Sequence, residues 1–193
     1  MGLWVQSLNN IPIEAHREYY IYLLDYGWHE QLGQALMDNY EKMASLAADN
    51  NAVVIRGTHR VHFEDEVFSW HHINGEDAEK LLPAILITNR HPHLFKESYG
   101  NQKTRTESGL KMILIPLKNF CSTTTDVVTL IERLFADIRF HKDLKDFRIQ
   151  REMKKGFGRA IADALILEPN FAGVGLNFSK LIDFLKNKDD KNS

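Results

Sequence analysis

Histidine side chains are concentrated in one part of this sequence, together with several carboxylates. Six of the nine histidines lie between positions 59 and 93, and three consecutive acids lie among them. They are His59, His62, His71, His72, His91, His93, Glu64, Asp65 and Glu66. Imidazoles and carboxylates bind zinc or iron where three or four of them converge. The segment therefore raises the hypothesis of a metal-dependent hydrolase or nuclease. Its candidate metal ligands are His62, His71, His91 and His93.

The spacing of these histidines also allows simpler interpretations. His62 and His71 would approach each other across a predicted β-hairpin. His91 and His93 follow a buried strand, and the carboxyl end of a strand is a common place for a ligand. However, the segment has no His-Glu-x-x-His or comparable signature. We therefore favour histidines that lie exposed on the hairpin or anchor loops, with a pH-sensitive or partner-binding role as an alternative, and we expect no cofactor.

A second group of charged side chains is basic. Seven cations follow one another closely: Lys142, Lys145, Arg148, Arg151, Lys154, Lys155 and Arg159. Such a run can bind phosphates. However, only Phe147 and Phe157 supply aromatic rings there, and the whole chain has a formal net charge of -2. Nucleic-acid binding thus stays open but is not favoured, and a solvated face or an acidic surface on a protein partner fits the run better.

Length and composition exclude several other classes. The 193 residues, 44% hydrophobic and 26% charged, are typical of one globular domain. The single cysteine, Cys121, excludes an internal disulfide and a cysteine-rich metal site. P-loop, Gly-x-Ser-x-Gly and dinucleotide signatures are absent, which weakens the case for an enzyme. With no export signal and no apolar run of about 20 residues, we expect a cytoplasmic protein without membrane contact.

Hydrophobic patterning predicts strands that alternate with helices, and hence an α/β protein. Strands are expected at 17–24, 52–56, 83–88, 110–117 and 145–151, after an irregular lead-in at 1–14, and a β-hairpin is expected at 59–73. Helices are expected at 29–49, 76–82, 158–167 and 179–186. A further helix is expected to begin at Thr123, with Asp126 in the capping-box position.

Two short segments resemble the thioredoxin fold family. The stretch from Ile21 through Trp28 to Leu32 resembles the family's first strand running into its Trp-Cys-x-x-Cys helix start. Leu82-Pro83-Ala84 resembles the cis-proline that enters its third strand. The resemblance implies a mixed sheet flanked by helices, with a core at 15–139 into which the hairpin is inserted. It leaves an appended β-α-α element at 140–187 packed on that core, and a disordered tail at 188–193.

The resemblance also implies where the chain departs from the family's chemistry. The two cysteine positions are occupied by His29 and Leu32, and thiol–disulfide exchange needs sulfur at both. A scaffold without these cysteines is expected to bind a protein partner as a non-catalytic adaptor or sensor. The candidate partner-binding residues are Asp25, Trp28, His29 and Pro83, with Trp28 as an interface anchor or, alternatively, as a cap on the sheet.

The C-terminal part is similar to another group of proteins. A strand, a glycine-containing bend at 156–158 and two amphipathic helices look like the effector-associated constant components of prokaryotic conflict systems. That likeness implies a subunit of a prokaryotic, antiviral-defence assembly.

Overall fold

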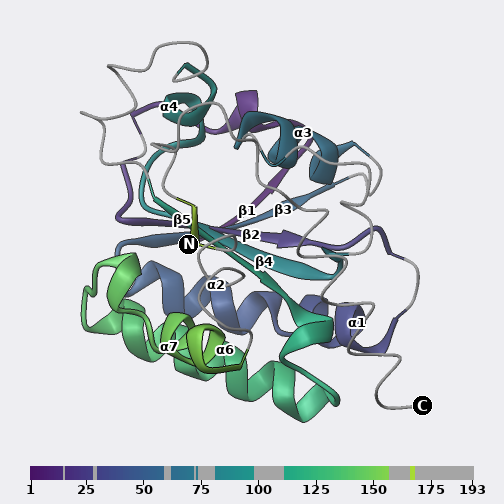
Figure 1. The fold of residues 1–193 in the computed structure, drawn as a ribbon. Coiled ribbons are helices and arrows are strands. Elements are labelled where there is room, and N and C mark those ends of the chain that lie inside the picture. The colour runs from purple at the N-terminus through teal and green to yellow at the C-terminus, as the bar shows by residue number, and fades with distance from the viewer. Residues whose placement is uncertain are drawn as a thin grey trace.

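The computed structural model describes residues 1–14, 16–27, 30–58, 62–71, 73, 81–97, 111–156 and 166–167. Within them, helices cover both faces of a mixed β-sheet, which confirms the α/β prediction (Figure 1). The strands are β1 (Gly2–Val5), β2 (Tyr19–Leu24), β3 (Ala52–Gly57), β4 (Ala84–Thr88), β5 (Met112–Pro116) and β6 (Ile166–Leu167). They lie in the order β1-β3-β2-β4-β5-β6. β1, β3 and β2 run parallel, whereas β4, β5 and β6 each pair antiparallel with the preceding strand in that order.

The helices form two layers, one on each face of the sheet. One layer contains α1 (Gln31–Asp38), α2 (Tyr40–Ala48), α6 (Thr124–Arg139) and α7 (Arg148–Gly156) (Figure 1). The other contains α3 (Phe63–Trp70) and α4 (Pro92–Glu97). Short 3-10 helices are η1 (Leu8–Asn10), η3 (Leu117–Asn119) and η4 (Leu144–Asp146). Because both faces are covered, β2, β4 and β5 are buried along their whole length and have nearly continuous apolar sequences.

The predicted helix at 29–49 is two helices that meet at Asn39. This residue ends α1 and precedes α2, and its side-chain amide donates to the Ala35 carbonyl at 2.8 Å. The predicted start of the long helix is confirmed. The Thr123 hydroxyl accepts from the Asp126 N–H, and the Asp126 carboxylate accepts from the Thr123 N–H in return.

The hairpin predicted at 59–73 is wrong, because residues 63–70 form helix α3. Phe63, Val67 and Trp70 are buried at the spacing i, i+4 and i+7, so one face of a helix packs on the sheet. Val61, Phe63, Val67 and Ser69 alternate in the sequence, which led to the strand interpretation. Three acids in the first turn favour the helix, since its N-terminus carries partial positive charge.

Three other predictions differ from the structure at the two ends of the chain. Residues 2–5, expected in an irregular lead-in, form edge strand β1 beside β3, so the sheet begins before the predicted core at 15–139. The strand expected at 145–151 is instead η4 followed by α7, and Asp137 accepts a backbone hydrogen bond from Arg148 where that helix begins. Ile166 and Leu167, expected in a helix, pair with β5. Residues 179–193, with the predicted last helix and tail, lie outside the described residues.

The two chain segments that carry the thioredoxin resemblance lie next to each other. Leu24 of β2 pairs with Ala84 of β4, which places Asp25 and Pro83 at neighbouring strand ends. Pro83 is buried, and the Leu82–Pro83 peptide bond is cis. Every helix in the described ranges is too short or too polar to cross a lipid bilayer.

Candidate functional site

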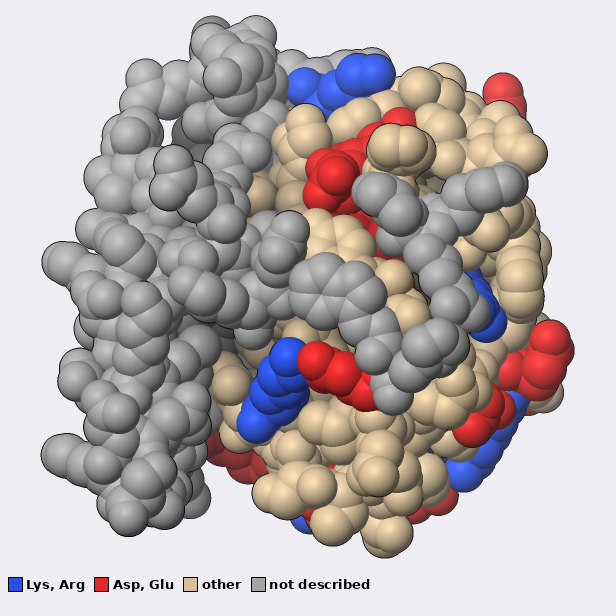
Figure 2. All heavy atoms as spheres, turned by 90° about the vertical axis from the view of Figure 1, so that its right-hand side faces the viewer, with Lys and Arg blue, Asp and Glu red and all other residues tan. Residues whose placement is uncertain are grey.

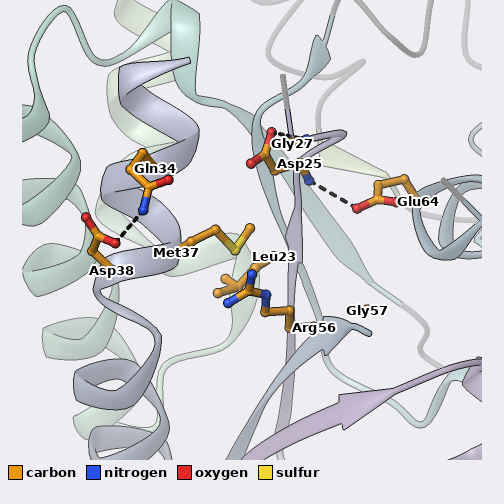
Figure 3. Close-up of a pocket in the computed structure, with 9 residues that line it drawn as sticks. All are labelled: Leu23, Asp25, Gly27, Gln34, Met37, Asp38, Arg56, Gly57 and Glu64. Carbon is orange, nitrogen blue, oxygen red and sulfur yellow. Dashed lines mark hydrogen bonds between the residues drawn. The ribbon is translucent and has the colours of Figure 1, made fainter. Parts of the chain in front are cut away.

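The candidate site lies where β2 and β3 end. These strands are parallel neighbours, but the chain leaves β2 for α1 on one face of the sheet and leaves β3 for α3 on the other (Figure 1). Such a divergence opens a crevice at the carboxyl ends of the strands, where α/β proteins commonly bind ligands. A pocket of about 140 Å³ occupies this position (Figure 3). Its lining residues are Leu23, Asp25, Gly27, Gln34, Met37, Asp38, Arg56, Gly57 and Glu64.

Asp25 is the first residue after β2 and is held by the turn that follows it. Its Oδ1 accepts a hydrogen bond from the Gly27 N–H at 3.0 Å (Figure 3). Gly27 has φ 74°, a conformation that glycine adopts without steric cost. On the other side, Gly33 of α1 lies so close that a Cβ there would be 2.8 Å from Asp25 Oδ2. The turn and the helix therefore confine the carboxylate from two directions.

Glu64 is the buried carboxyl group of the pocket. It lies in the first turn of α3 and is only 3% exposed. Its Oε1 accepts the Asp25 backbone N–H at 3.3 Å, whereas its Oε2 is buried without a hydrogen-bond partner among the described residues (Figure 3). Burial, helped by the charges of Asp25 and Asp65, raises the pKa of Glu64 from 4.5 to about 7, although two backbone hydrogen bonds act in the opposite direction. Glu64 therefore changes charge near neutral pH.

The two acids that follow Glu64 have structural partners. Glu66 accepts from the Ser7 hydroxyl and from the Leu8 N–H, both at 2.7 Å, and so fixes η1 to α3. Asp65 accepts from the Tyr26 hydroxyl at 3.0 Å on the surface. Of the three consecutive acids, only Glu64 lines the pocket.

The rest of the pocket lining, apart from Asp25, Glu64 and their neighbours, comes from α1 and the end of β3. The Arg56 guanidinium lies 4.4 Å from the centre of the Trp4 ring, a cation–π contact with the edge strand. Gln34 donates to Asp38 at 2.6 Å along the exposed side of α1, and Leu23 and Met37 supply apolar surface between the polar groups (Figure 3). Within the described chain, Arg56 forms no ion pair with any of the pocket carboxylates.

A wider groove adjoins this pocket across α1. It has a volume of about 700 Å³ and lies between α1 and the start of α6. Its lining residues are Gln31, Gln34, Ala35, Asp38, Asn39, Thr124, Thr125 and Val128. Gln34 and Asp38 line both hollows. Seen from the side toward which β2 points, the described surface carries a group of acidic side chains, with basic side chains at separate places around it (Figure 2).

The structure brings together only part of the predicted partner-binding set. Asp25 lines the pocket, and Pro83 lies at the neighbouring strand end but is buried. Trp28 and His29 lie outside the described residues.

Sequence reasoning missed Arg56 and Glu64 as pocket residues. A signal was present in the case of Arg56, since polar residues at the carboxyl end of a predicted parallel strand are ligand candidates. Glu64 was hidden by the hairpin prediction.

The four predicted metal ligands occupy different environments. His62 is exposed before α3, whereas His71 is buried after it, with Nδ1 2.7 Å from the Val67 carbonyl oxygen and its ring against Tyr22. His91 and His93 stack at 5.2 Å between ring centres, and burial lowers the pKa of His91. In the part of the chain that the structure describes, no three His, Cys, Asp or Glu side chains are arranged to hold a metal ion.

The basic stretch contributes to internal packing in its described part. Lys142 and Arg148 both contact the buried Asp137 carboxylate. These two cations stabilise the junction of α6 and α7.

Cys121 has the properties of a structural thiol. It is buried and free, and burial together with the charge of Asp126 raises its pKa to about 11. A thiol with so high a pKa is almost entirely protonated at neutral pH and is a poor nucleophile.

Comparison with known proteins finds no match to this chain among family models, curated proteins or solved structures.

Proposed function

We propose that this chain is a thioredoxin-like binding protein without thiol–disulfide activity, which recognises a protein partner at the pocket between the ends of β2 and β3. It would act in the cytoplasm as an adaptor or sensor subunit of a larger assembly. The free cysteine suits a reducing compartment. The resemblance of the C-terminal part to conflict-system modules suggests a prokaryotic defence assembly.

The strand arrangement supports the thioredoxin-like part of the proposal. Three parallel strands in the order β1-β3-β2 continue into antiparallel β4 and β5. A mixed sheet with helices on both faces is the architecture that the resemblance implies. Leu32, which occupies one of the family's cysteine positions, lies in the first turn of α1.

The absence of a second cysteine from the sequence supports a binding role over a redox role. Disulfide exchange needs an attacking thiolate and a second sulfur. The sequence contains one cysteine, and its thiol is buried far along the chain from α1. Without that chemistry, recognition is the function that such a scaffold can retain.

The observation that carries the proposal is the pocket at the diverging strand ends together with the groove beside it. The pocket alone, at about 140 Å³, is smaller than the roughly 300–1,000 Å³ that small-molecule sites usually enclose. The groove of about 700 Å³ shares Gln34 and Asp38 with the pocket. A protein segment lying along α1 could fill the groove and place one side chain in the pocket.

Site-specific photo-crosslinking tests this proposal. A crosslinking amino acid at Gln34, an exposed position on the rim of both hollows, should capture a discrete protein in the native cells. Lys145 provides the matched control. Lys145 is exposed and follows Lys142 closely in the chain. The Lys142 carbonyl accepts a hydrogen bond from the Tyr19 hydroxyl at the start of β2, whereas the pocket lies at the end of that strand. A binary complex with the purified partner must then reproduce the Gln34 crosslink. Identical crosslinks from both positions, or none from Gln34, would refute the proposal.

A further inference from the structure

We infer that the pocket binds the positively charged end of a lysine or arginine side chain, which contacts the carboxylates of Glu64 and Asp25. This inference rests on the proposed function, because the basic side chain would belong to the partner segment. It adds the chemistry by which the pocket selects its ligand.

The unsatisfied oxygen of Glu64 is the first reason. The side chain is 3% exposed, and its carboxyl group points toward Asp25 at the pocket (Figure 3). Oε1 has a donor in the Asp25 N–H, but Oε2 is buried without one in the described ranges. Buried carboxylate oxygens are normally hydrogen-bonded, and an acceptor without a donor is costly to keep from water. A ligand N–H group would supply the missing donor.

The balance of charge in the lining favours a cationic donor. Among the lining residues that the structure describes, Asp25, Asp38 and Glu64 are acidic and Arg56 is basic. Arg56 is directed to the Trp4 ring and neutralises none of the three acids through an ion pair in the described chain. Burial raises the pKa of Glu64 and so disfavours its ionised form. A positively charged group nearby would stabilise that form.

The size and the apolar part of the pocket limit what the cation can be attached to. A volume of about 140 Å³ accepts the end of a side chain. Leu23 and Met37 line the space between the polar groups, as the methylene stem of lysine or arginine requires. Gln34 and Asp38 connect this space to the groove, along which the partner's backbone could lie.

Small amines test the inference independently of any partner. The full chain is titrated with n-butylammonium and n-butylguanidinium, with butanol and butyrate as uncharged and anionic controls, while amide NMR signals are followed. We expect saturable shifts of the Gly27, Gln34 and Gly57 amides with a cationic probe only. The relative affinities of the two cations distinguish a lysine from an arginine site. Butyrate shifting these amides, or no saturable shift with either cation, would overturn the inference.

Variants assign the effect to the carboxylates. Glu64→Gln keeps the shape and the acceptor for the Asp25 N–H but removes the charge, and it should weaken probe binding about tenfold or more. Asp25→Asn should also weaken it and serves if Glu64→Gln does not fold. Glu132→Gln, an exposed position on α6 paired with Lys42, is the control and should bind the probe normally. Equal binding by all four proteins would overturn the inference. The inference would also be overturned by a partner that crosslinks at Gln34 but binds the Glu64→Gln variant normally. That result would leave the proposed function intact.

Discussion

The backbone N–H of Asp25 donates to the Glu64 carboxylate at 3.3 Å, which joins the end of β2 to the start of α3. These residues lie 39 positions apart in the sequence and come from connections on opposite faces of the sheet. The hydrogen bond therefore spans the point where the two connections diverge. It positions the Glu64 carboxyl group in the pocket, beside the turn that holds the Asp25 carboxylate.

The pH dependence of stability should reveal the buried Glu64. Its folded pKa of about 7 exceeds the ordinary value of 4.5, because burial and the charges of Asp25 and Asp65 disfavour ionisation. The folded state therefore binds a proton that the unfolded state has already released between these values. We expect the free energy of unfolding to fall as pH rises from about 5 to 8, by up to about 3 kcal/mol.

Denaturant unfolding of the wild type and of Glu64→Gln over this pH range measures the effect. The variant lacks the titrating group, so it should lose less stability as pH rises and should be the more stable protein at pH 8. Parallel curves for the two proteins would show that Glu64 titrates normally.

Gly33→Ala should perturb the pocket through Asp25. In an unobstructed helix this substitution stabilises by about 1 kcal/mol. Here the new Cβ would meet Asp25 Oδ2 at 2.8 Å, so either the carboxylate or α1 must move. We expect a net destabilisation of about 1–2 kcal/mol, measured by denaturant unfolding.

A double-mutant cycle separates this contact from other effects of the methyl group. In an Asp25→Ala background the obstructing carboxylate is gone, and Gly33→Ala should become neutral or stabilising. The same destabilisation in both backgrounds would show that Asp25 is not the obstacle.

Much of the sheet could be predicted from the sequence because its strands are buried on both faces. The apolar runs of β2, β4 and β5 are nearly continuous and of strand length, a pattern typical of strands covered by helices on both sides. The capping pair Thr123 and Asp126 likewise located the start of α6, because a short local motif determines that end. These features depend on residues close together in the chain.

The pocket could not be predicted in the same way, because tertiary contacts create it. Glu64 belongs to three consecutive acids, and only the packing of α3 directs it inward while Asp65 and Glu66 find other partners. Residues 63–70 fitted a strand as well as a helix, and burial of Phe63, Val67 and Trp70 on the sheet decided the outcome. Edge strand β1 depends on pairing with β3, 52 positions away for the pair Gly2 and Val54.

Removal of the buried charge of Asp137 should lower the free energy of unfolding. The carboxylate is 1% exposed and accepts the Arg148 N–H at 2.6 Å, the Arg148 Nε at 3.0 Å and the Lys142 ammonium. Burial opposes its ionisation, but the hydrogen bonds from Lys142 and Arg148 hold its pKa below the usual value. Asp137→Asn should lower the free energy of unfolding at pH 7 by about 2–3 kcal/mol.

The control is Asp143→Asn, which breaks a partly exposed pair with Lys111 and should cost about 1 kcal/mol or less. Because the pKa of Asp137 is lowered on folding, its contribution is complete above the unfolded value and declines as pH falls below about 4. Thermal unfolding at pH 7 and at pH 3 should therefore show a larger difference between wild type and Asp137→Asn at the higher pH. An equal difference at both would contradict an ionised Asp137.

Cys121 should be unreactive in the folded protein. Its pKa of about 11 leaves little thiolate at neutral pH, and the side chain is 4% exposed. We expect a disulfide reagent such as dithionitrobenzoate to modify Cys121 slowly in the folded chain and rapidly after unfolding in guanidinium chloride. We also expect no catalysis of insulin reduction, since exchange needs a second cysteine that the chain lacks. Insulin turnover above the uncatalysed rate that survives Cys121→Ser would contradict the binding role, because it would place redox chemistry on a chain without cysteine.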